Sequence, residues 1–588
     1  MPGIEWPPVA AWLLARSHVR PDDPAGHGHH RAVARSQPDP DDCGPALSCL
    51  RQIGPAAIVG LLLGMLALGP GLKRGFLLSY DMVSVPRQPF TATIFGLTGT
   101  LPRAVPSDAV AAAAARALPA DIVQKLLLLS IFVLACSGMA ALLAGEHWLA
   151  RLAGAVFYAW NPFVAERLII GQWALLLGYG ALPWVLCTLV RTAPTRWRPA
   201  GRQTLTLTLA LLPAAVGGFS AMCLSALVVV PAAACAAGQA ARRILSVGAA
   251  LLVLAVLSLP WLVPALTRTV HTSPAGVAAF AARADTPFGA FGSLLMLSGV
   301  WNAQTVPAGY GGPLSAVWLV LGLAALGGYL ALGRRRWPGL GIAAAAGLAA
   351  ACIGLTGPGR DLLRAMIQFW PGFAVLRDGQ QFVAPLALAE AAGAGLGVAW
   401  LMRLRRTAGL KEMRYLLGAI AAMAPVVLLP GLAWGAAGRL RAVQYPADWL
   451  VARSVIDGDR APGSALLLPW AAYRRFGWND SEAVLDPWPR LLSRPVIWND
   501  GVQVGPVTIP SEDPRALALN GVISSGAPLT RRLQAAGVRY VIVDAGFSPA
   551  SPSSRAAEPG GYPFRGRLPG CRVVLAGPGL AVYQVPHR

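Results

Sequence analysis

Long apolar stretches, each about as long as a membrane-spanning helix, constrain the fold more than any other feature of the sequence. About 20 consecutive apolar residues of α-helix are needed to cross a bilayer. Hydrophobic residues make up 55% of the chain and charged residues only 13%, against about a quarter in soluble domains. The composition excludes an ordinary soluble protein and predicts an all-α polytopic membrane protein. The eleven predicted spans are 53–72, 122–144, 149–165, 171–190, 203–218, 219–238, 244–266, 313–333, 338–356, 381–402 and 415–435.

Four short segments rich in basic residues predict the orientation of the chain. They lie at 191–202, 242–243, 334–336 and 403–414. Cytoplasmic loops carry an excess of Lys and Arg, and eleven spans with a cytoplasmic N-terminus place all four segments on that side. The same bias accounts for a formal net charge of +22, so we expect no nucleic-acid partner. The predicted location is the cell membrane, with the C-terminus on the outer face.

Composition divides the chain into three predicted parts. Residues 1–52 are rich in Pro, Asp, His and Arg, which predicts a disordered cytoplasmic tail. Residues 53–435 contain the spans and form the predicted transmembrane domain. Residues 436–588 contain more charges, Trp and Pro and no long apolar run, which predicts a small extracytoplasmic α/β domain. Its predicted strands are 464–469, 538–544, 571–576 and 580–585, and its predicted helices, each beginning with Pro, are 514–520 and 528–536.

Part of this outer domain, residues 470–500, is dense in aromatic side chains with carboxylates between them. Aromatic faces stack on sugars and carboxylates bind hydroxyl groups, so the segment is a candidate glycan-binding surface. The alternative is that the rings form a core or anchor the domain at the membrane interface. The candidate sugar-binding residues are Trp470, Trp478, Trp488, Trp498 and Asp480.

The first predicted outer loop carries an aspartate, Asp81, among apolar residues shortly after the first span. A carboxylate partly removed from water has a raised pKa and can act as a general base, whereas a nearby arginine such as Arg87 lowers that pKa. The alternative is an aspartate that merely stabilises a turn. Asp108 in the same loop has an adequate structural explanation, as an acid in the first turn of a helix with Ser107 as its N-cap.

Four other features near or within the predicted spans are candidates for a function. Arg377, at the start of the tenth span, is suited to gripping a lipid phosphate or to snorkelling toward water. Glu390, near the middle of that span, would serve a proton or cation path or pair with a basic residue. Asn161-Pro162 breaks the third span, either to line a cavity or as a simple kink. Segment 357–370 predicts an amphipathic helix in the membrane interface.

Several chemistries find no support in the sequence. Of its eight cysteines only Cys571 clearly lies in a predicted outer part, which excludes an extracytoplasmic disulfide framework. No GxxxxGK[ST] phosphate-binding segment occurs, so ATP hydrolysis is not expected. The loop around Asp81 has no Asp-x-Asp pair, and we assign neither a metal nor a cofactor.

The acid in the first outer loop, the Trp160-Asn161-Pro162 break and the segment from Leu376 to Phe382 together resemble the GT-C superfamily of multi-spanning glycosyltransferases. The outer domain, with its strand from Gly537 to Val543, is also similar. This resemblance implies sugar transfer from a polyprenyl-phosphate donor to a glycan or glycolipid acceptor on the outer face of the membrane. The Ala-, Arg- and Gly-rich composition resembles that of actinobacterial proteins, in which similar arabinofuranosyl- and mannosyltransferases build the cell envelope.

By the same resemblance the reaction is an inverting transfer. Asp81 would be the catalytic base, Arg377 and Arg87 would bind the donor phosphate, and the outer domain would hold the acceptor. The loop departs from mannosyl- and oligosaccharyl-transferring relatives because no second acid adjoins Asp81. Two other classes stay open. One is a transporter or flippase of lipid-linked glycans that uses Glu390, and the other is a non-catalytic envelope assembly protein.

Overall fold

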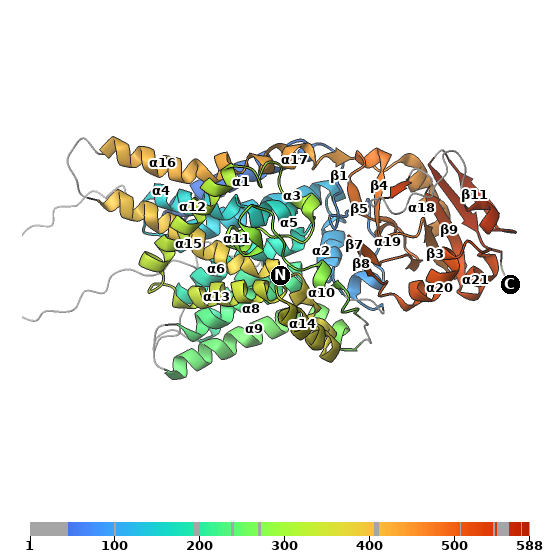
Figure 1. Cartoon of the computed structure of the whole chain (residues 1–588), viewed down its shortest axis with the longest axis horizontal. Helices are drawn as coiled ribbons and strands as arrows, with labels where there is room; N and C mark the ends of the chain where they lie inside the picture. Colours follow the sequence, from blue (N-terminus) through green and yellow to red (C-terminus); the bar gives the residue numbers. More distant parts are fainter. Residues whose placement is uncertain are drawn as a thin grey trace, which may run out of the picture.

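The molecule is elongated, with a bundle of helices at one end and a strand-containing region, orange to red in Figure 1, at the other. The chain is therefore mostly helical with a C-terminal part that contains strands, as predicted. Most of the predicted tail and parts of the basic segments lie outside the described residues. The computed structural model describes residues 45–98, 102–191, 200–236, 240–267, 272–404, 411–505, 507–544, 547–549, 564–577 and 579–586.

The helices come first along the chain, and most strands follow them. The helices of the bundle are α1 (Pro45–Leu68), α2 (Ser107–Ala114), α3 (Ala120–Leu142), α4 (Trp148–Ala159), α5 (Pro162–Ile169), α6 (Trp173–Arg191), α7 (Ala200–Gly217), α8 (Phe219–Ala234), α9 (Ala240–Thr267), α10 (Gly276–Ala279), α11 (Gly289–Leu295), α12 (Leu314–Gly328), α13 (Pro338–Ile353), α14 (Gly357–Phe369), α15 (Ala384–Arg403), α16 (Lys411–Leu428) and α17 (Ala433–Gly438). The other helices are α18 (Ala447–Gly458), α19 (Trp488–Leu491), α20 (Pro514–Ser524) and α21 (Thr530–Ala535). The strands are β1 (Phe76–Leu77), β2 (Ala442–Val443), β3 (Ser464–Leu468), β4 (Tyr473–Phe476), β5 (Ala483–Leu485), β6 (Val496–Ile497), β7 (Val502–Val504), β8 (Val507–Ile509), β9 (Val538–Asp544), β10 (Phe547–Pro549), β11 (Arg572–Ala576) and β12 (Leu580–Gln584).

Six helical segments of the described chain are long and apolar enough to cross a membrane. Two bent pairs raise the number to eight if each pair is one span: α13 with α14, bent by 95°, and the helices on either side of Leu429, bent by 57°. The predicted third and sixth spans correspond to the shorter helices α4 and α8. The six segments are Ile53–Leu72, Ala120–Leu142, Trp173–Arg191, Ala240–Thr267, Leu314–Gly333 and Gly379–Arg403.

The predicted break at Asn161-Pro162 is confirmed, and the asparagine organises it. Asn161 is the N-cap of α5, and its side-chain oxygen accepts a hydrogen bond from the Val164 N–H at 3.1 Å. Pro162 occupies the first helical position, where its missing N–H leaves no bond unmade. The Asn161 amide also donates to the Tyr179 hydroxyl at 2.9 Å, so the break is tied to the next span.

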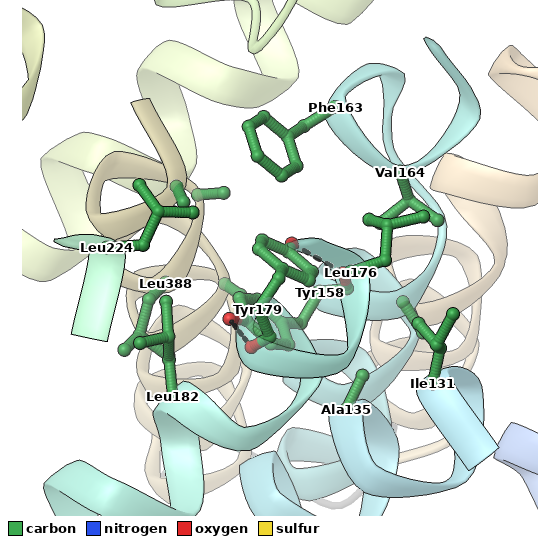
Figure 2. Packing of buried hydrophobic residues seen from close by; sticks show 14 of the residues in the cluster. Ile131, Ala135, Tyr158, Phe163, Val164, Leu176, Tyr179, Leu182, Leu224 and Leu388 are labelled. Carbon is green, nitrogen blue, oxygen red and sulfur yellow. Dashed lines mark hydrogen bonds between the residues drawn. The ribbon is translucent and has the colours of Figure 1, made fainter. Parts of the chain in front are cut away.

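Two stacked tyrosines connect the helix before this break, α4, to α6 (Figure 2). The rings of Tyr158 and Tyr179 lie 4.3 Å apart, and each hydroxyl donates to the backbone carbonyl of the other residue, at 2.7 and 2.8 Å. The pair lies in the apolar core of the bundle, where Phe163 stacks on Tyr179. A buried hydroxyl needs a partner, and this reciprocal arrangement supplies one to each ring.

The strand-containing region has a five-stranded mixed sheet, ordered β11-β12-β9-β3-β6, with helices on both faces. Alternate residues of β3 face opposite sides, as the period of a strand requires. Leu467 packs in one core with Trp449 of α18, whereas Leu466 packs in another with Leu519 of α20 and Leu533 of α21. The predicted strands are found at their expected positions, and β11 and β12 pair antiparallel as expected.

The two predicted helices of this region have different outcomes. Helix α20 begins at Pro514 as predicted, with the Asp513 side chain as its cap. Helix α21 begins at Thr530, so the predicted start at Pro528 is wrong by two residues. The reason is tertiary, because the Leu529 N–H donates to the Arg567 carbonyl at 2.7 Å and Leu529 becomes the N-cap.

The predicted capping role of Ser107 is also wrong. Ser107 is the first residue of α2, and its hydroxyl donates to the Ala104 carbonyl at 3.1 Å. Asp108 does lie in the first helical turn, but its carboxylate accepts a hydrogen bond from Arg490 Nε at 2.7 Å. This acid therefore joins the first loop to the strand-containing region, which the sequence did not indicate.

Candidate active site

The loop that carries Asp81 pairs on one side with the strand-containing region. The Tyr80 N–H donates to the Ala483 carbonyl at 2.7 Å, and the Leu485 N–H donates to the Tyr80 carbonyl at 2.8 Å. Tyr80 thereby forms a parallel bridge to β5. The backbone beside Asp81 is fixed by the same kind of hydrogen bonds that hold a sheet together.

The other side of the loop packs against the corner between α5 and α6. The Asp81 N–H donates to the Ile170 carbonyl at 3.0 Å. Gly171 has a φ of +87°, and a Cβ built there would lie only 2.1 Å from the Met82 nitrogen. Glycine suits this corner because it adopts the left-handed conformation without strain and lets the two backbones come into contact.

The Asp81 carboxylate accepts a hydrogen bond on Oδ1 from the Tyr473 hydroxyl, at 2.5 Å. The residue as a whole is half-buried, but its carboxylate lies deep enough that burial raises its pKa above the ordinary value. The Tyr473 hydrogen bond and the charges of Arg103 and Arg490 oppose this rise, and the charge of Asp378 adds to it. A carboxylate with a raised pKa is a stronger base, which suits proton abstraction from a hydroxyl group.

Asp378 brings the start of the predicted tenth span to the same place. Its Oδ2 accepts a hydrogen bond from Gln172 Nε2 at 3.5 Å and lies 3.8 Å from Arg167 Nη1. Gln172 and Arg167 flank the corner that holds the Asp81 backbone. The Arg167 side chain is only 1% exposed, and its Nε and Nη1 have no hydrogen-bond partner among the described residues. A buried guanidinium with free donors can bind phosphate oxygens.

Arg377, the first predicted phosphate ligand, reaches into the loop that follows α9. Its Nη1 donates to the Ser273 carbonyl at 3.3 Å, and its guanidinium lies 5.2 Å from the centroid of the Phe280 ring. Burial lowers the pKa of Arg377 to about 10, so the side chain remains a cation at neutral pH. The charge of Arg103 acts on the pKa of both Arg377 and Asp81, so the two predicted site residues share a charged neighbour.

Arg87, the second predicted phosphate ligand, is exposed on the first loop and has a φ of +52°. Its carbonyl accepts a hydrogen bond from Arg453 Nη2 at 2.8 Å. This contact attaches the loop to α18 through the backbone of Arg87. The role of its side chain stays a prediction.

The predicted sugar-binding rings differ in accessibility. Trp488 is fully buried and stacks on Trp449 at a centroid distance of 4.5 Å. Trp478 stacks on Phe476 at 5.1 Å in the same aromatic cluster. These contacts favour the core interpretation for both rings. The partly or fully exposed members of the predicted set are Trp470, Trp478, Trp498 and Asp480, and Trp478 and Trp498 both pack against the aromatic cluster.

Glu390 is buried in α15, within a candidate span. Its Oε2 has no hydrogen-bond partner among the described residues, and a Cβ built on Gly322 of α12 would lie 3.6 Å from this oxygen. The structure shows no basic residue paired with Glu390 in the part of the chain that it describes. A role for Glu390 stays a prediction.

Sequence reasoning did not assign four residues of this site. Tyr473 lies 392 positions from Asp81 in the chain, and no local pattern connects residues so far apart. Arg103 belongs to the same outer loop as Asp81, but nothing in the sequence indicated that its charge would act on that carboxylate. Arg167 and Asp378 could have been predicted, since both lie in or next to segments that the sequence analysis identified as polar features. In the described ranges, no three His, Cys, Asp or Glu side chains lie together in a group that could hold a metal ion.

No known protein-family model matches the sequence, and no curated protein matches it. Solved structures with a similar fold include two single-particle cryo-EM structures of the arabinofuranosyltransferase AftD from mycobacteria. One has a TM-score of 0.57 at 17% identity, and a mutant of the enzyme has a TM-score of 0.54 at 19% identity. Each comparison covers 92% of this chain. The chain thus has a fold similar to that of AftD.

The predicted resemblance to GT-C glycosyltransferases is thus confirmed at the level of the fold. This chain spans 40% of the first AftD structure and 42% of the second. At these identities the likeness establishes the fold alone. Together with the six or more apolar helices, it shows a multi-pass membrane protein.

Proposed function

We propose that this chain is a membrane glycosyltransferase that moves a sugar from a polyprenyl-phosphate donor to a cell-envelope glycan or glycolipid. One observation carries the proposal: Asp81, with its raised pKa, is held between the strand-containing region and the α5–α6 corner of a GT-C fold. AftD, which has this fold, is an arabinofuranosyltransferase. The proposed sugar is accordingly an arabinofuranosyl or mannosyl residue.

In the proposed reaction, Asp81 is the general base. Its Oδ2 accepts the proton of an acceptor hydroxyl, because the Tyr473 hydroxyl occupies Oδ1. The acceptor oxygen forms a bond to the anomeric carbon from the face opposite the phosphate. The bond between the anomeric carbon and the phosphate oxygen breaks, and polyprenyl phosphate leaves with the bonding electron pair. The sugar is therefore transferred with inversion.

The leaving phosphate needs cations as its negative charge develops. Arg377 and Arg87 are the ligands that the GT-C resemblance implies. The structure adds Arg167, whose buried guanidinium has free donors beside Asp378. Because Asp378 also acts on the pKa of Asp81, phosphate binding at Arg167 would place the leaving group close to the base.

The strand-containing region would hold the acceptor, since it supplies Tyr473 to the site. Trp470, Trp478, Trp498 and Asp480 are the accessible candidates for sugar contacts, and Trp488 lies in the core. In the proposed topology of eleven spans with the N-terminus inside, the site lies on the outer face. Nucleotide sugars are cytoplasmic, so a lipid-linked donor suits such a site.

The direct test is glycosyl transfer by membranes from cells that express the chain or its Asp81→Asn variant. Radiolabelled polyprenyl-phosphate sugars and envelope glycans would be supplied as donors and acceptors. We expect Asp81→Asn to lose about 10²–10⁴-fold in rate, the usual contribution of a general base. Asp361→Asn is the matched control, because this carboxylate is 73% exposed on α14.

Each outcome separates the proposed function from the alternatives. Equal transfer by wild type and Asp81→Asn would keep the enzyme and reject the base. No transfer across a broad donor panel, with equal expression, would favour an assembly protein or a transporter. A transporter would in turn be impaired most by Glu390→Gln, since Glu390 is a buried acid within a candidate span.

A further inference from the structure

An open groove of about 540 Å³ lies beside the bend between α13 and α14. The loop that follows α9 forms one wall, which includes Arg283 and Trp301. Gly354, Leu355 and Arg360 line the other wall. None of these residues takes part in the proposed transfer step.

The groove lies where a candidate span ends. Helix α13 belongs to that span, and the chain turns by 95° into α14. Helix α14 is amphipathic as predicted: the apolar face with Leu363 and Ile367 is buried against Val277, and the apolar side chains of Leu362 and Phe369 are in addition 53% and 86% exposed. A helix of this kind lies at the boundary between headgroups and acyl chains. Since the groove adjoins the end of this candidate span, we expect it to open near the lipid phosphates.

Two guanidinium groups line the groove, and one of them, Arg283, is paired with a carboxylate outside the lining. Arg283 is 44% exposed, and its acidic neighbour Asp285 lies 3.4 Å away with its side chain fully buried. Asp285 accepts a hydrogen bond from the Gly299 N–H at 2.7 Å, and burial raises its pKa to about 6. Arg360 uses Nη1 to donate to two carbonyls of the turn before α14. The groove lining that the structure describes contains arginines but no carboxylate.

An aromatic side chain connects the groove to the candidate active site. The Phe280 ring meets the Trp301 ring edge-on at a centroid distance of 4.8 Å. Arg377 lies over the same Phe280 ring at 5.2 Å. Arg377 precedes Asp378, whose charge acts on Asp81. Two rings, Trp301 in the groove wall and Phe280 behind it, thus connect the groove to the arginine assigned to the donor phosphate.

We infer that this groove binds the phosphate group of a membrane lipid through Arg283 and Arg360, before that phosphate reaches Arg377. Arginine suits this role because its planar guanidinium forms paired, charge-assisted hydrogen bonds with phosphate oxygens. The lipid chain would remain in the bilayer along α14. The inference rests on the proposed function only in naming the lipid as the polyprenyl-linked sugar donor.

The test uses the full chain in nanodiscs of phosphatidylcholine. The protein would be titrated with a fluorescent polyprenyl phosphate and with the corresponding uncharged polyprenol. We expect the double variant Arg283→Gln/Arg360→Gln to bind the phosphate lipid about tenfold more weakly or worse, because charge-assisted hydrogen bonds to phosphate are lost. Binding of the polyprenol should not change. Arg334→Gln/Arg335→Gln is the control, since it removes the same charge from exposed positions near the opposite end of α13.

Three results would overturn the inference. The first is an unchanged affinity of the groove variant, and the second is an equal loss in the control variant, which would indicate unspecific attraction. The third is displacement of the lipid by inorganic phosphate at equal concentration, which would assign the groove to free phosphate. The Asp81→Asn variant separates this test from the proposed function. It should bind the lipid normally while losing transfer, and retained transfer would reject the base without affecting the groove.

Discussion

The hydrogen bond from Tyr473 to Asp81 has two consequences at the scale of single residues. It occupies Oδ1 of Asp81 and leaves Oδ2 for a substrate. It also lowers the pKa of Asp81, which burial raises. The hydroxyl comes from the strand-containing region, whereas the carboxylate belongs to the first loop. The strength of the candidate base therefore depends on contacts between distant parts of the chain.

Tyr473→Phe should move the acidic limb of the pH–rate profile to higher pH. Without the hydroxyl the pKa of Asp81 rises further, and a general base works only when it is deprotonated. Transfer should therefore fall more at acidic pH than at alkaline pH. The measurement is kcat/KM for glycosyl transfer as a function of pH. Tyr415→Phe, at a ring 40% exposed on α16, is the control, and identical acidic limbs for the two variants would contradict the role of Tyr473.

At the scale of elements, the corner between α5 and α6 positions the loop of Asp81. The Asn161-Pro162 break ends α4 and starts α5, which brings Ile170 and Gly171 against the loop. On its opposite side the loop is bridged to β5. A single helix in place of α4 and α5 would not form this corner, so the break has a positional role.

Gly171→Ala should impair transfer strongly, because the new Cβ would lie 2.1 Å from the Met82 nitrogen and displace the loop. Gly145→Ala is a matched control. Gly145 has a nearly equal φ of +90°, but a Cβ built there meets no atom within 4 Å. Both variants share the left-handed backbone cost of roughly 1–2 kcal/mol. Thermal unfolding should show that cost alone in Gly145→Ala and a larger loss in Gly171→Ala, and activity of the folded protein should fall only in Gly171→Ala. Equal activities would show that the contact with Met82 does not position the base.

For the whole molecule, the strand-containing region and the helical bundle are joined around the site rather than at a distance from it. Arg490 contacts Asp108 at 2.7 Å, and Arg103 contacts Glu512 at 2.6 Å. The Tyr80 bridge to β5 adds backbone hydrogen bonds. The region is therefore expected to complete the active site as well as to hold the acceptor.

A double-mutant cycle on Asp108→Asn and Arg490→Gln tests this connection. Both side chains are mostly buried, so their coupling should be about 1–3 kcal/mol in thermal or denaturant unfolding. The two single variants should differ in the pH profile of transfer. Arg490→Gln removes a charge that lowers the pKa of Asp81, so its acidic limb moves to higher pH, whereas Asp108→Asn leaves that charge in place. No coupling, together with equal profiles, would argue against a joint that controls the base.

Features governed by local chemistry were predictable from the sequence. Six of the eleven predicted spans, or eight with the two bent pairs, coincide with helices long and apolar enough to cross a membrane, whereas α4 and α8 are shorter than the stretches that predicted them. Proline chemistry located the break before α5 and the start of α20, but it placed the start of α21 two residues too early. The buried strands β3 and β9 were found by their apolar runs.

The environment of the candidate base was decided by the tertiary structure. Asp81 and Arg377 were identified as single residues. Packing of segments that are distant in the chain brings Tyr473 to Asp81 and Arg167 to Asp378, the neighbour of Arg377. Trp488 illustrates the same limit, since the sequence of an aromatic-rich segment does not show whether its rings contact a sugar or one another. Burial and hydrogen bonding set a pKa and a ring's accessibility, and neither is a property of the local sequence.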